Sequence, residues 1–353
     1  MIYNTYDELI EKFNPNNIYF NAMPVKSKGA IWNFFMSDRS DGKTLNCKIL
    51  TIIDFYLYNH AHVYVRRYDT EMSEIMKKTF LDKLIRIYPF INDLLDFKQD
   101  SIGILAKQKY EDEDKFRYMV YFIPLSMSGK LKSQIEDERI SDIDFDEYIP
   151  LDNKYLKDEM LYVMELYKTV DRDRDTLRFN FFGNKISAFN PFFDFFNIET
   201  HIERGKIKLY KNDTIALQVY ISRTLKQKRS MSKFNQSVAN TSYEDYNNSG
   251  ILLEQDLKLD DIKDAQFYVS FKSIRGEGSI WIKNYHYIIS CKSYGVGLQI
   301  VDKMYNTNRE SINCLAGNIQ QLFKHAYKIN DIYFESQKAY YLFEPILRKI
   351  NIN

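Results

Sequence analysis

The stretch FFMSDRSDGKTLNCKIL, residues 34–50, decides how the surrounding chain is expected to fold. Its centre follows the phosphate-binding loop pattern G-x-x-x-x-G-K-[ST], in which a tight turn leads from a strand into a helix and its N–H groups face a phosphate. The first glycine alone differs, because a serine occupies that position. Serine is a small substitute, so we expect a turn that is strained but allowed. The loop residues expected to bind a nucleotide are Ser37, Asp38, Arg39, Ser40, Asp41, Gly42, Lys43 and Thr44.

The residues on either side of this loop have the periodicities that such a site requires. GAIWNFFM (29–36) is an apolar run typical of a strand, and TLNCKILTIIDFYLYNH (44–60) spaces apolar residues at helical intervals. A strand, a loop and a helix in this order direct the N-terminus of the helix at an anion. The alternative is a polar turn between a strand and a helix, but the flanking elements favour a nucleotide site.

The bulk composition is that of a folded globular protein without a strong overall charge. The 353 residues suffice for two domains, and 45% are hydrophobic and 16% aromatic. Lys and Arg number 49 against 48 Asp and Glu, so any contact with a polyanion must be local. Three cysteines without paired spacing predict reduced thiols in a cytoplasmic setting, and five scattered histidines suggest no zinc site. The N-terminal segment predicts neither a signal peptide nor a membrane span.

Alternating strand-like and helix-like runs up to about residue 199 predict an α/β fold with a largely parallel sheet. Further strands are expected at residues 61–68, 114–124, 139–146 and 176–182, and helices at residues 73–88 and 156–170. We therefore assign residues 1–200 to a P-loop domain. Residues 201–260 are first basic and then rich in Asn and Ser, which indicates a linker or hinge. Residues 261–353 are expected to form a small α+β domain.

An acidic pair, Asp146 and Glu147, closes the strand-like run ISDIDFDEYIP (140–150). Nucleotide hydrolysis requires one carboxylate that holds Mg²⁺ and another group that activates the attacking water. Asp146 would face the metal and Glu147 the water. The strand is unusually polar, because Asp142 and Asp144 interrupt it, and such a pair is often only a solvated turn. Its combination with the phosphate loop favours a hydrolytic site.

Two polar features follow along the chain. TLRFNFFGN (176–184) is strand-like and ends in Asn184, whose amide is suited to sense the γ-phosphate or the water. Just before it, Arg172 and Arg174 belong to the alternating string DRDRD. These arginines form either a salt-bridged surface turn or, at the level of the γ-phosphate, a source of positive charge for the site of a neighbouring subunit.

Four segments in order carry a more specific signal: SDRSDGKT (37–44), HVYVRRYDTEM (62–72), FIPLS with DFDEY (122–126 and 144–148), and the run from LYKTV to FFNI (166–198). Together they resemble the DNA-encapsidation ATPases of small podoviruses, the motors that drive genomic double-stranded DNA into a preformed prohead. NPFFDFFN (190–197) is the most distinctive part, because it is not a general feature of phosphate-binding loops. The resemblance covers most of residues 30–200 and is thin beyond Thr200.

This resemblance implies a P-loop ATPase domain of the additional-strand, catalytic-glutamate (ASCE) type, a short linker, and a C-terminal domain that resembles a vestigial RNase H-like nuclease. ATP and Mg²⁺ are the implied cofactors. The implied partners are double-stranded viral DNA, the prohead portal vertex, directly or through a scaffold RNA, and further copies of the chain in a ring, expected to be a pentamer, with no membrane involved. The implied location is the host cell cytoplasm, with transient attachment to the prohead and absence from the mature virion.

The resemblance also implies roles for individual residues. Lys43 and Thr44 would bind phosphate and Mg²⁺, Asp146 the metal and Glu147 the water, while Asn184 would act as a sensor. Arg172 matches the arginine finger of the family. The other residues considered for a role in a neighbouring subunit's site are Arg174, Lys130 and Lys132.

DNA contact is expected to use a few lysines whose phosphate contacts are made and released repeatedly. A solvated surface explains the same lysines equally well. Asp69 follows VRRY where we would expect a basic residue able to face DNA, so this strand is not predicted to grip DNA. The candidates for DNA contact are Lys77, Lys78, Lys226, Lys228 and Arg229.

Two other functions compete with a packaging motor. A terminase-like nuclease needs three or four carboxylates that hold two metals, but Asp260, Asp261, Asp264 and Glu277 are expected at a linker edge and a turn rather than on strand centres. A non-catalytic, nucleotide-gated adaptor would result if Ser37 or the polar strand disabled the site. Metal-dependent DNA cutting identifies the nuclease, and ATP turnover with and without DNA separates the adaptor from the motor.

Overall fold

The computed structural model divides the chain into two compact units, Met1–Leu252 and Leu253–Asn353, each of which is described by itself. The structure describes residues 3–15, 18–110, 115–131, 135–150, 155–184, 190–198, 205–220, 222, 224–225, 227, 231–237, 259–295, 297–302, 310–329 and 331–351.

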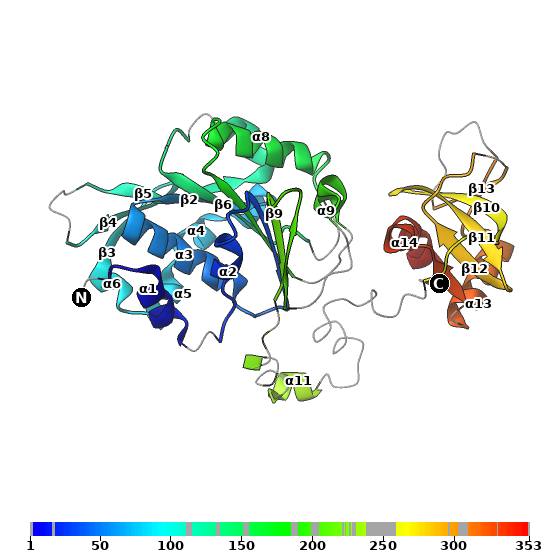
Figure 1. Cartoon of the computed structure of the whole chain (residues 1–353), viewed down its shortest axis with the longest axis horizontal. Coiled ribbons are helices and arrows are strands. Elements are labelled where there is room, and N and C mark those ends of the chain that lie inside the picture. The colour runs from blue at the N-terminus through cyan, green and yellow to red at the C-terminus, as the bar shows by residue number, and fades with distance from the viewer. Residues whose placement is uncertain are drawn as a thin grey trace. The chain divides into compact units, whose positions relative to one another are not determined.

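The first unit is built on a nine-stranded sheet with the strand order β3-β4-β5-β2-β6-β7-β1-β9-β8 (Figure 1). Its six central strands run parallel: β1 (Trp32–Ser37), β2 (Ala61–Arg66), β5 (Arg117–Pro124), β6 (Ile140–Asp146), β7 (Arg178–Asn184) and β9 (Ile215–Val219). The edge strands β3 (Leu95–Gln99), β4 (Gly103–Gln108) and β8 (Ile207–Tyr210) join antiparallel. The fold is therefore mixed α/β with a large, mostly parallel sheet, as the sequence predicts.

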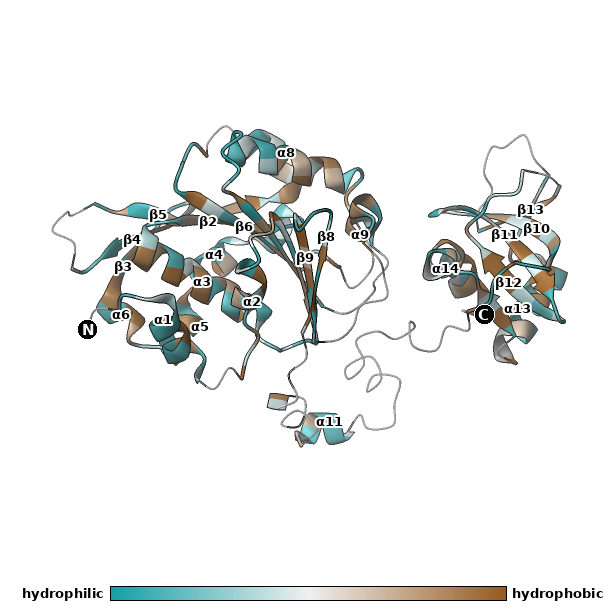
Figure 2. Cartoon of the chain, viewed as in Figure 1, coloured by the Kyte–Doolittle hydropathy of each residue, from teal (hydrophilic) through white to brown (hydrophobic). Residues whose placement is uncertain are grey.

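Helices cover both faces of this sheet, as expected when parallel strands are buried on both sides. One face carries α1 (Tyr6–Phe13), α2 (Met23–Lys26), α3 (Lys43–Tyr58), α4 (Glu74–Lys78), α5 (Asp82–Ile87) and α6 (Ile91–Leu94). The other carries α8 (Glu159–Asp171) and α9 (Pro191–Phe196). Shorter helical segments are η2 (Asp69–Glu71), η3 (Leu125–Met127), α7 (Ser128–Leu131) and α11 (Lys233–Ser237). Figure 2 shows hydrophobic residues concentrated on the central strands between the two helix layers.

Strand β1 shows how the sequence pattern places the two cores. Phe34 and Met36 point to the α8 and α9 face, and Phe35 points to the α3 face. Phe34 stacks on Phe181 of the neighbouring strand β7, with ring centroids 4.4 Å apart. A continuous apolar strand is what a central position in a parallel sheet demands.

Strand β6 departs from this pattern, because its three aspartates are all buried on the α3 face while Ile143 and Phe145 face α8 and α9. The aspartates are held by hydrogen bonds and ion pairs. Asp142 lies 2.9 Å from Lys26 Nζ, and Asp144 lies 2.7 Å from Nδ1 of His62. Asn180 of β7 donates to both carboxylates at 2.8 Å. The polar residues that seemed to interrupt the strand are thus neutralised within the sheet.

His62 of β2 completes this buried charge network, because its Nε2 lies 2.8 Å from Asp54 on α3. Burial alone would lower the pKa of His62, but the negative charges of Asp144 and Asp142 and the hydrogen bonds to Asp144 and Asp54 raise it to about 10. Burial would raise the pKa of Asp54, yet Lys26 and His62 lower it to about 2. The network is therefore a set of charges that compensate one another, with His62 present as imidazolium at neutral pH.

The second unit is a six-stranded sheet with the order β14-β13-β10-β11-β12-β15. Strands β10 (Gln266–Ser273), β11 (Gly276–Lys283) and β12 (His286–Ser290) form an antiparallel meander. The strands β13 (Gln299–Val301), β14 (Ser311–Asn313) and β15 (Ile332–Phe334) extend it in parallel. Helices α13 (Gly317–Lys328) and α14 (Gln337–Asn351) pack into one apolar core with this sheet.

Three expectations need correction. The sheet of the first unit continues through β8 and β9, so the boundary expected at residue 200 is too early. Residues 73–88 form two short helices, α4 and α5, because the chain turns between Lys78 and Asp82. The antiparallel hairpin β3-β4 was not predicted. Within the described residues, the helices are too short or too polar to cross a lipid bilayer.

The raised pKa of His62 predicts how the first unit responds to pH. The stability that its proton contributes is fully present below the ordinary pKa of about 6.5 and is lost as the pH rises through 10. Between pH 7 and 9 the free energy of unfolding should therefore fall, with His62 contributing up to about 1.4 kcal/mol per pH unit. Urea unfolding of the first unit can be followed by tryptophan fluorescence in a Trp281→Phe background. The chain has two tryptophans, so this change leaves only Trp32 of β1.

His62→Gln should flatten this pH dependence. His60→Gln is the matched control, because burial lowers the pKa of His60 and its effect on stability belongs to lower pH. An unchanged slope between pH 7 and 9 in His62→Gln would contradict the assignment of a buried imidazolium.

Candidate active site

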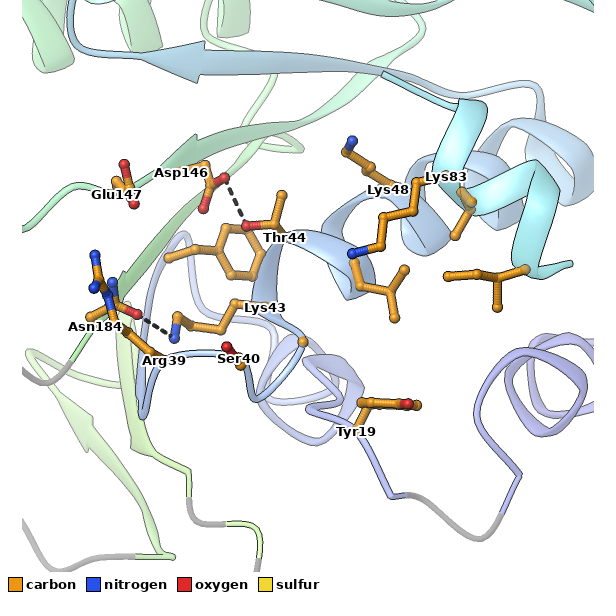
Figure 3. A pocket seen from close by; sticks show the side chains of 15 residues that line it. Tyr19, Arg39, Ser40, Lys43, Thr44, Lys48, Lys83, Asp146, Glu147 and Asn184 are labelled. Atoms are coloured by element: carbon orange, nitrogen blue, oxygen red, sulfur yellow. Dashed lines mark hydrogen bonds between the residues drawn. The ribbon is translucent and has the colours of Figure 1, made fainter. Parts of the chain in front are cut away.

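Strand β1 ends at Ser37 and helix α3 begins at Lys43, so the strand, loop and helix predicted around GKT are present. The loop opens onto a cavity of about 610 Å³ (Figure 3). Its lining comes from the loop, from α3 and α5, and from the carboxyl ends of β6 and β7. The lining residues are Tyr19, Arg39, Ser40, Gly42, Lys43, Thr44, Leu45, Lys48, Lys83, Leu84, Ile87, Asp146, Glu147, Phe182 and Asn184.

The tight part of the loop lies at Ser40 and Gly42, which have φ angles of 64° and 98°. Gly42 is required for a second reason, since a Cβ there would lie 3.2 Å from Cβ of Tyr19. Ser37 is a buried residue of the extended strand and does not share this left-handed geometry. The strain expected at Ser37 is therefore absent, because the turn falls three residues later. Inside the loop, the N–H of Asp38 donates to the carboxylate of Asp41 at 3.1 Å.

Lys43 is buried and its ammonium group lies among oxygen atoms of the loop and of β7. It donates to the hydroxyl of Ser37 at 2.8 Å, to the carbonyl of Asp38 at 3.0 Å, and to the amide oxygen of Asn184 at 2.9 Å. The serine that replaces glycine thus contributes a direct hydrogen bond to Lys43. The same contacts bring together the lysine expected to bind phosphate and the asparagine expected to act as a sensor.

Asp146 lies at the end of β6 and accepts a hydrogen bond from the hydroxyl of Thr44 at 2.9 Å. The hydroxyl of Tyr64 donates to the same carboxylate at 2.8 Å. A hydroxyl and a carboxylate at the N-terminus of a helix are the hard oxygen ligands that Mg²⁺ prefers next to a phosphate. Thr44 and Asp146 therefore fit a magnesium ion bound together with a nucleotide.

Glu147 follows Asp146 in a left-handed conformation with φ of 61°, and 47% of its side chain is exposed. Arg66, at the end of the adjacent strand β2, lies 2.5 Å from the carboxylate of Glu147 and 3.4 Å from that of Asp146. This ion pair occupies the carboxylate that would take a proton from water, so it must open before Glu147 can act as a base.

The two arginines of DRDRD lie at the other end of the sheet. Arg172 ends α8, has 53% of its side chain exposed, and lies 3.0 Å from Glu136. Arg174 donates to the carbonyls of Val170 and Asp171, so it caps the end of α8. Both precede β7, whereas Asn184 ends it, so the arginines are not at the level of the γ-phosphate in their own subunit. The expected position at the level of the γ-phosphate is therefore wrong for their own subunit, and a role of Arg172 in a neighbouring subunit's site is a proposal.

The remaining basic candidates that the structure describes, Lys77, Lys78 and Lys130, do not line the cavity. Lys130 is exposed on α7, which follows the carboxyl end of β5. Lys77 is partly buried on α4 beside Glu74, and Lys78 is exposed. Four residues lie outside the described part of the chain: Lys132, Lys226, Lys228 and Arg229.

Three of the four carboxylates considered for nuclease chemistry, Asp260, Asp261 and Glu277, are engaged by cations. Asp260 lies 2.9 Å from Lys283 and 3.1 Å from His286, and Glu277 lies 2.9 Å from Lys272. Among the described residues of the second unit, His, Cys, Asp and Glu side chains form no group of three that would suit a metal ion.

Several residues of the site were not identified from the sequence. Tyr19, Lys83 and Leu84 reach the cavity from segments that carry no motif, and Lys48 reaches it from α3, beyond the motif at the start of that helix. Arg66 and Arg67 of the segment VRRY were noted as part of a resemblance without a role. Their position at the carboxyl end of a predicted strand was the available signal, because parallel strands bring these ends to one edge of the sheet.

The fold and the cavity place the first unit among the mixed α/β proteins whose large, mostly parallel sheet carries a cavity at the carboxyl ends of its strands. The chain belongs to the family described as Podovirus DNA encapsidation protein (Gp16), whose model matches residues 15–352. The resemblance drawn from four sequence segments is therefore confirmed.

Three similar proteins illustrate the relationship. A DNA packaging protein of Bacillus phage phi29 is 26% identical over 230 residues, which cover 64% of this chain and 64% of that protein. A DNA packaging protein of Bacillus phage B103 is 27% identical over 216 residues, covering 60% and 61%. The matches thus span less than two thirds of these relatives. A chain of the bacteriophage Phi-29 viral genome packaging motor assembly shares the fold, with a TM-score of 0.64, 21% identity, and coverage of 93% of this chain and 99% of that one.

The geometry of Ser37 leads to a prediction about the missing glycine. Ser37→Gly restores the usual pattern but should not improve ATP binding, because the position is extended and the Lys43 contact is lost. The change should instead lower stability by about 0.5–1 kcal/mol, as glycine does inside a strand. Ser40→Gly is the matched control, because its positive φ suits glycine. Calorimetric ATP binding and urea unfolding measure both effects, and tighter binding by Ser37→Gly would contradict this account.

Proposed function

We propose that this protein is a DNA-packaging motor ATPase that couples ATP hydrolysis to the movement of double-stranded viral DNA into a prohead. The observation that carries the proposal is the convergence of Lys43, Thr44, Asp146, Glu147 and Asn184 on one cavity at the carboxyl ends of three parallel strands. Membership of a DNA encapsidation family supports the choice of DNA as the substrate that is moved.

The order of strands supports an ASCE-type ATPase. Strand β7, which carries Asn184, lies between β1, which leads into the phosphate loop, and β6, which carries Asp146 and Glu147. This arrangement separates Lys43 from Glu147 by the width of one strand. A γ-phosphate held by Lys43 thereby leaves room for a water molecule beside Glu147.

The chemistry proposed for this site is attack of water on the γ-phosphorus of ATP. A bond forms between the water oxygen and phosphorus, and the bond from phosphorus to the β,γ-bridging oxygen breaks, with its electron pair remaining on ADP. Glu147 takes the proton of the attacking water, and Lys43 neutralises charge on the phosphate oxygens. Asn184 orients the water or the γ-phosphate. Mg²⁺, when bound at Thr44 and Asp146, supplies further neutralisation of phosphate charge.

Two features of the site favour hydrolysis over a non-catalytic adaptor. Ser37 contacts Lys43 rather than distorting the loop. The aspartates of β6 that precede Asp146 are compensated by Lys26, His62 and Asn180, so they do not destabilise the strand.

We also propose that the second unit is a vestigial RNase H-like domain that has no nuclease activity. Its antiparallel meander, extended by parallel strands and covered by two helices, is consistent with that assignment. The pairing of Asp260 and Glu277 with lysines argues against the terminase-like alternative.

The proposed partners follow from the family and from the arrangement of charges. A motor of this kind would act as a homo-oligomeric ring, which we expect to be a pentamer, on the portal vertex of a prohead in the host cell cytoplasm. Arg172 supports a ring, because it is exposed at the end of the sheet remote from its own site, where its solvent-exposed ion pair with Glu136 could open toward a neighbour's nucleotide.

Changes in two residues should separate nucleotide binding from hydrolysis. Lys43→Ala should lose ATP binding, because the cation that contacts the phosphates is removed. Glu147→Gln should bind ATP with unchanged affinity but hydrolyse it at least about 100-fold more slowly, as expected when a general base is lost. The measurements are ATP binding by calorimetry and phosphate release with and without proheads and DNA. Near-normal turnover by Glu147→Gln would remove it from the catalytic role.

Mixed assemblies test whether Arg172 acts on a neighbouring subunit. Arg172→Ala should fold and bind ATP but lose the gain in turnover that assembly produces, which for an arginine finger is roughly 10³-fold. Turnover should partly return when these subunits are mixed with Glu147→Gln subunits, which still provide Arg172. Lys168→Ala, an exposed cation one turn earlier on α8, is the control. Mixed rings no more active than either mutant alone would show that Arg172 does not act in trans.

A further inference from the structure

The turn that carries Glu147 has an unfavourable backbone conformation. Glu147 has a φ of 61°, in the left-handed region that non-glycine residues seldom adopt. Residues persist in this region only when their surroundings hold them there. The side chain of Glu147 does not provide that restraint, because it is half-exposed and its ion pair is with Arg66, on the cavity side. The restraint must therefore come from contacts to the backbone of the turn.

Arg67 makes those contacts. Its guanidinium donates from Nη1 to the carbonyl of Glu147 at 3.2 Å and from Nη2 to the carbonyl of Tyr148 at 2.7 Å. Arg66 ends β2 and Arg67 follows it directly. Arg66 contacts Asp146 on the α3 face, whereas Arg67 contacts Glu159 of α8, so the two side chains lie on opposite faces of the sheet. Arg66 contacts the carboxylate of Glu147 on the cavity side, and Arg67 holds the main chain from the other side.

The position of Arg67 is itself tightly fixed. It is among the largest fully buried side chains, and Glu159, the first residue of α8, accepts from its Nε at 2.8 Å and from its Nη2 at 2.9 Å. The guanidinium carbon lies 5.4 Å from the ring centre of Phe145 and 5.2 Å from that of Tyr155. Binding two carbonyls and one carboxylate at once requires the planar, multidentate guanidinium of arginine, which lysine lacks.

The side chain of Tyr148 anchors the other end of the turn. It is fully buried and packs on Gly183 of β7, where an added Cβ would lie 2.5 Å from the ring. The N–H of Tyr148 also donates to the carbonyl of Phe182 at 3.3 Å. The turn around Glu147 is thus held by the packing of Tyr148 and by the hydrogen bonds from Arg67 to both carbonyls.

We propose that Arg67 is a positioning residue for hydrolysis: by binding the carbonyls of Glu147 and Tyr148, it holds the carboxylate of Glu147 where the attacking water lies. This inference rests on the proposed function, since it requires Glu147 to be the base. Arg67 does not line the cavity, so its effect on the reaction would pass through the turn. A base displaced by about 1 Å can cost a hundredfold in rate without any loss of substrate binding.

Arg67→Lys tests the proposal in the full chain, because it keeps a cation for Glu159 but cannot bind two carbonyls as well. We expect kcat to fall about tenfold or more, whereas KM and the calorimetric Kd for ATP should stay within about threefold of wild type. Arg139→Lys is the matched control. Arg139 also binds a carboxylate, that of Asp137, and a carbonyl, that of Tyr118, but it lies at the opposite end of β6, so kcat should not change.

A double-mutant cycle separates positioning from a general loss of structure. In a Glu147→Gln background, Arg67→Lys should not slow single-turnover hydrolysis further, because the group that it positions is already inactive. If Arg67→Lys slows both backgrounds equally, or weakens ATP binding as much as turnover, the residue is merely structural and the proposal is wrong. Wild-type kcat in folded Arg67→Lys would also overturn it.

If Arg67→Lys does not fold, a second variant provides the test. Arg67→Met combined with Glu159→Leu removes both buried charges together, which proteins often tolerate. The folded double variant should bind ATP and show the same loss of kcat, and wild-type kcat would contradict the proposal. The same measurements distinguish this proposal from the proposed function. Slow turnover by Glu147→Gln together with normal turnover by the Arg67 variants would contradict the positioning role alone. Normal turnover by Glu147→Gln would contradict the assignment of Glu147 as the base.

Discussion

The compensation of buried negative charge on one face of β6 is the constraint on which the first unit depends. Asp142, Asp144 and Asp146 alternate along the strand and all face α3. Charged carboxylates in such a position are costly unless each finds cations or hydrogen-bond donors. Lys26 and His62 supply charge, and Asn180, Thr44 and Tyr64 donate hydrogen bonds. Because these partners come from α2, α3, β2 and β7, satisfying the aspartates fixes four elements relative to β6.

This constraint also joins the fold to the site. The same helix, α3, presents Thr44 to Asp146 at its beginning and Asp54 to His62 near its end. The register of α3 on the sheet is therefore set at both ends, and the Thr44 hydroxyl lies opposite the carboxylate that suits a metal. A slip of the helix by one residue would break the contacts at both ends at once. The polar face of β6 thus helps to fix the position of Thr44 relative to Asp146.

The sequence was sufficient to predict the elements that carry strong local patterns. The apolar run before Ser37, the helix after Lys43 and the strands that end in Asp146 and Asn184 are all present. Prediction failed where tertiary contacts decide the outcome. The edge hairpins β3-β4 and β8-β9 gain their stability from pairing with distant strands. The contacts of Arg67 could not be predicted, because its partners Glu147 and Glu159 lie 80 and 92 residues away; only its place at the end of a strand was a signal. Ser37 was misjudged because the left-handed residues of the loop are Gly42 and Ser40, and the motif does not specify the latter.

Helix α8 connects two functional regions of the first unit, one at each of its ends. Glu159 at its start is bonded to Arg67, which holds the turn of Glu147, and Arg172 terminates its 13 residues at the opposite edge of the sheet. An α-helix of this length is about 20 Å long and behaves as a stiff rod. Under the proposed role of Arg172 in a neighbouring subunit's site, a shift of the Glu147 turn in one subunit would reach the next subunit through this helix. The order in which the subunits of such a ring hydrolyse ATP would then depend on this helical connection within each copy of the chain.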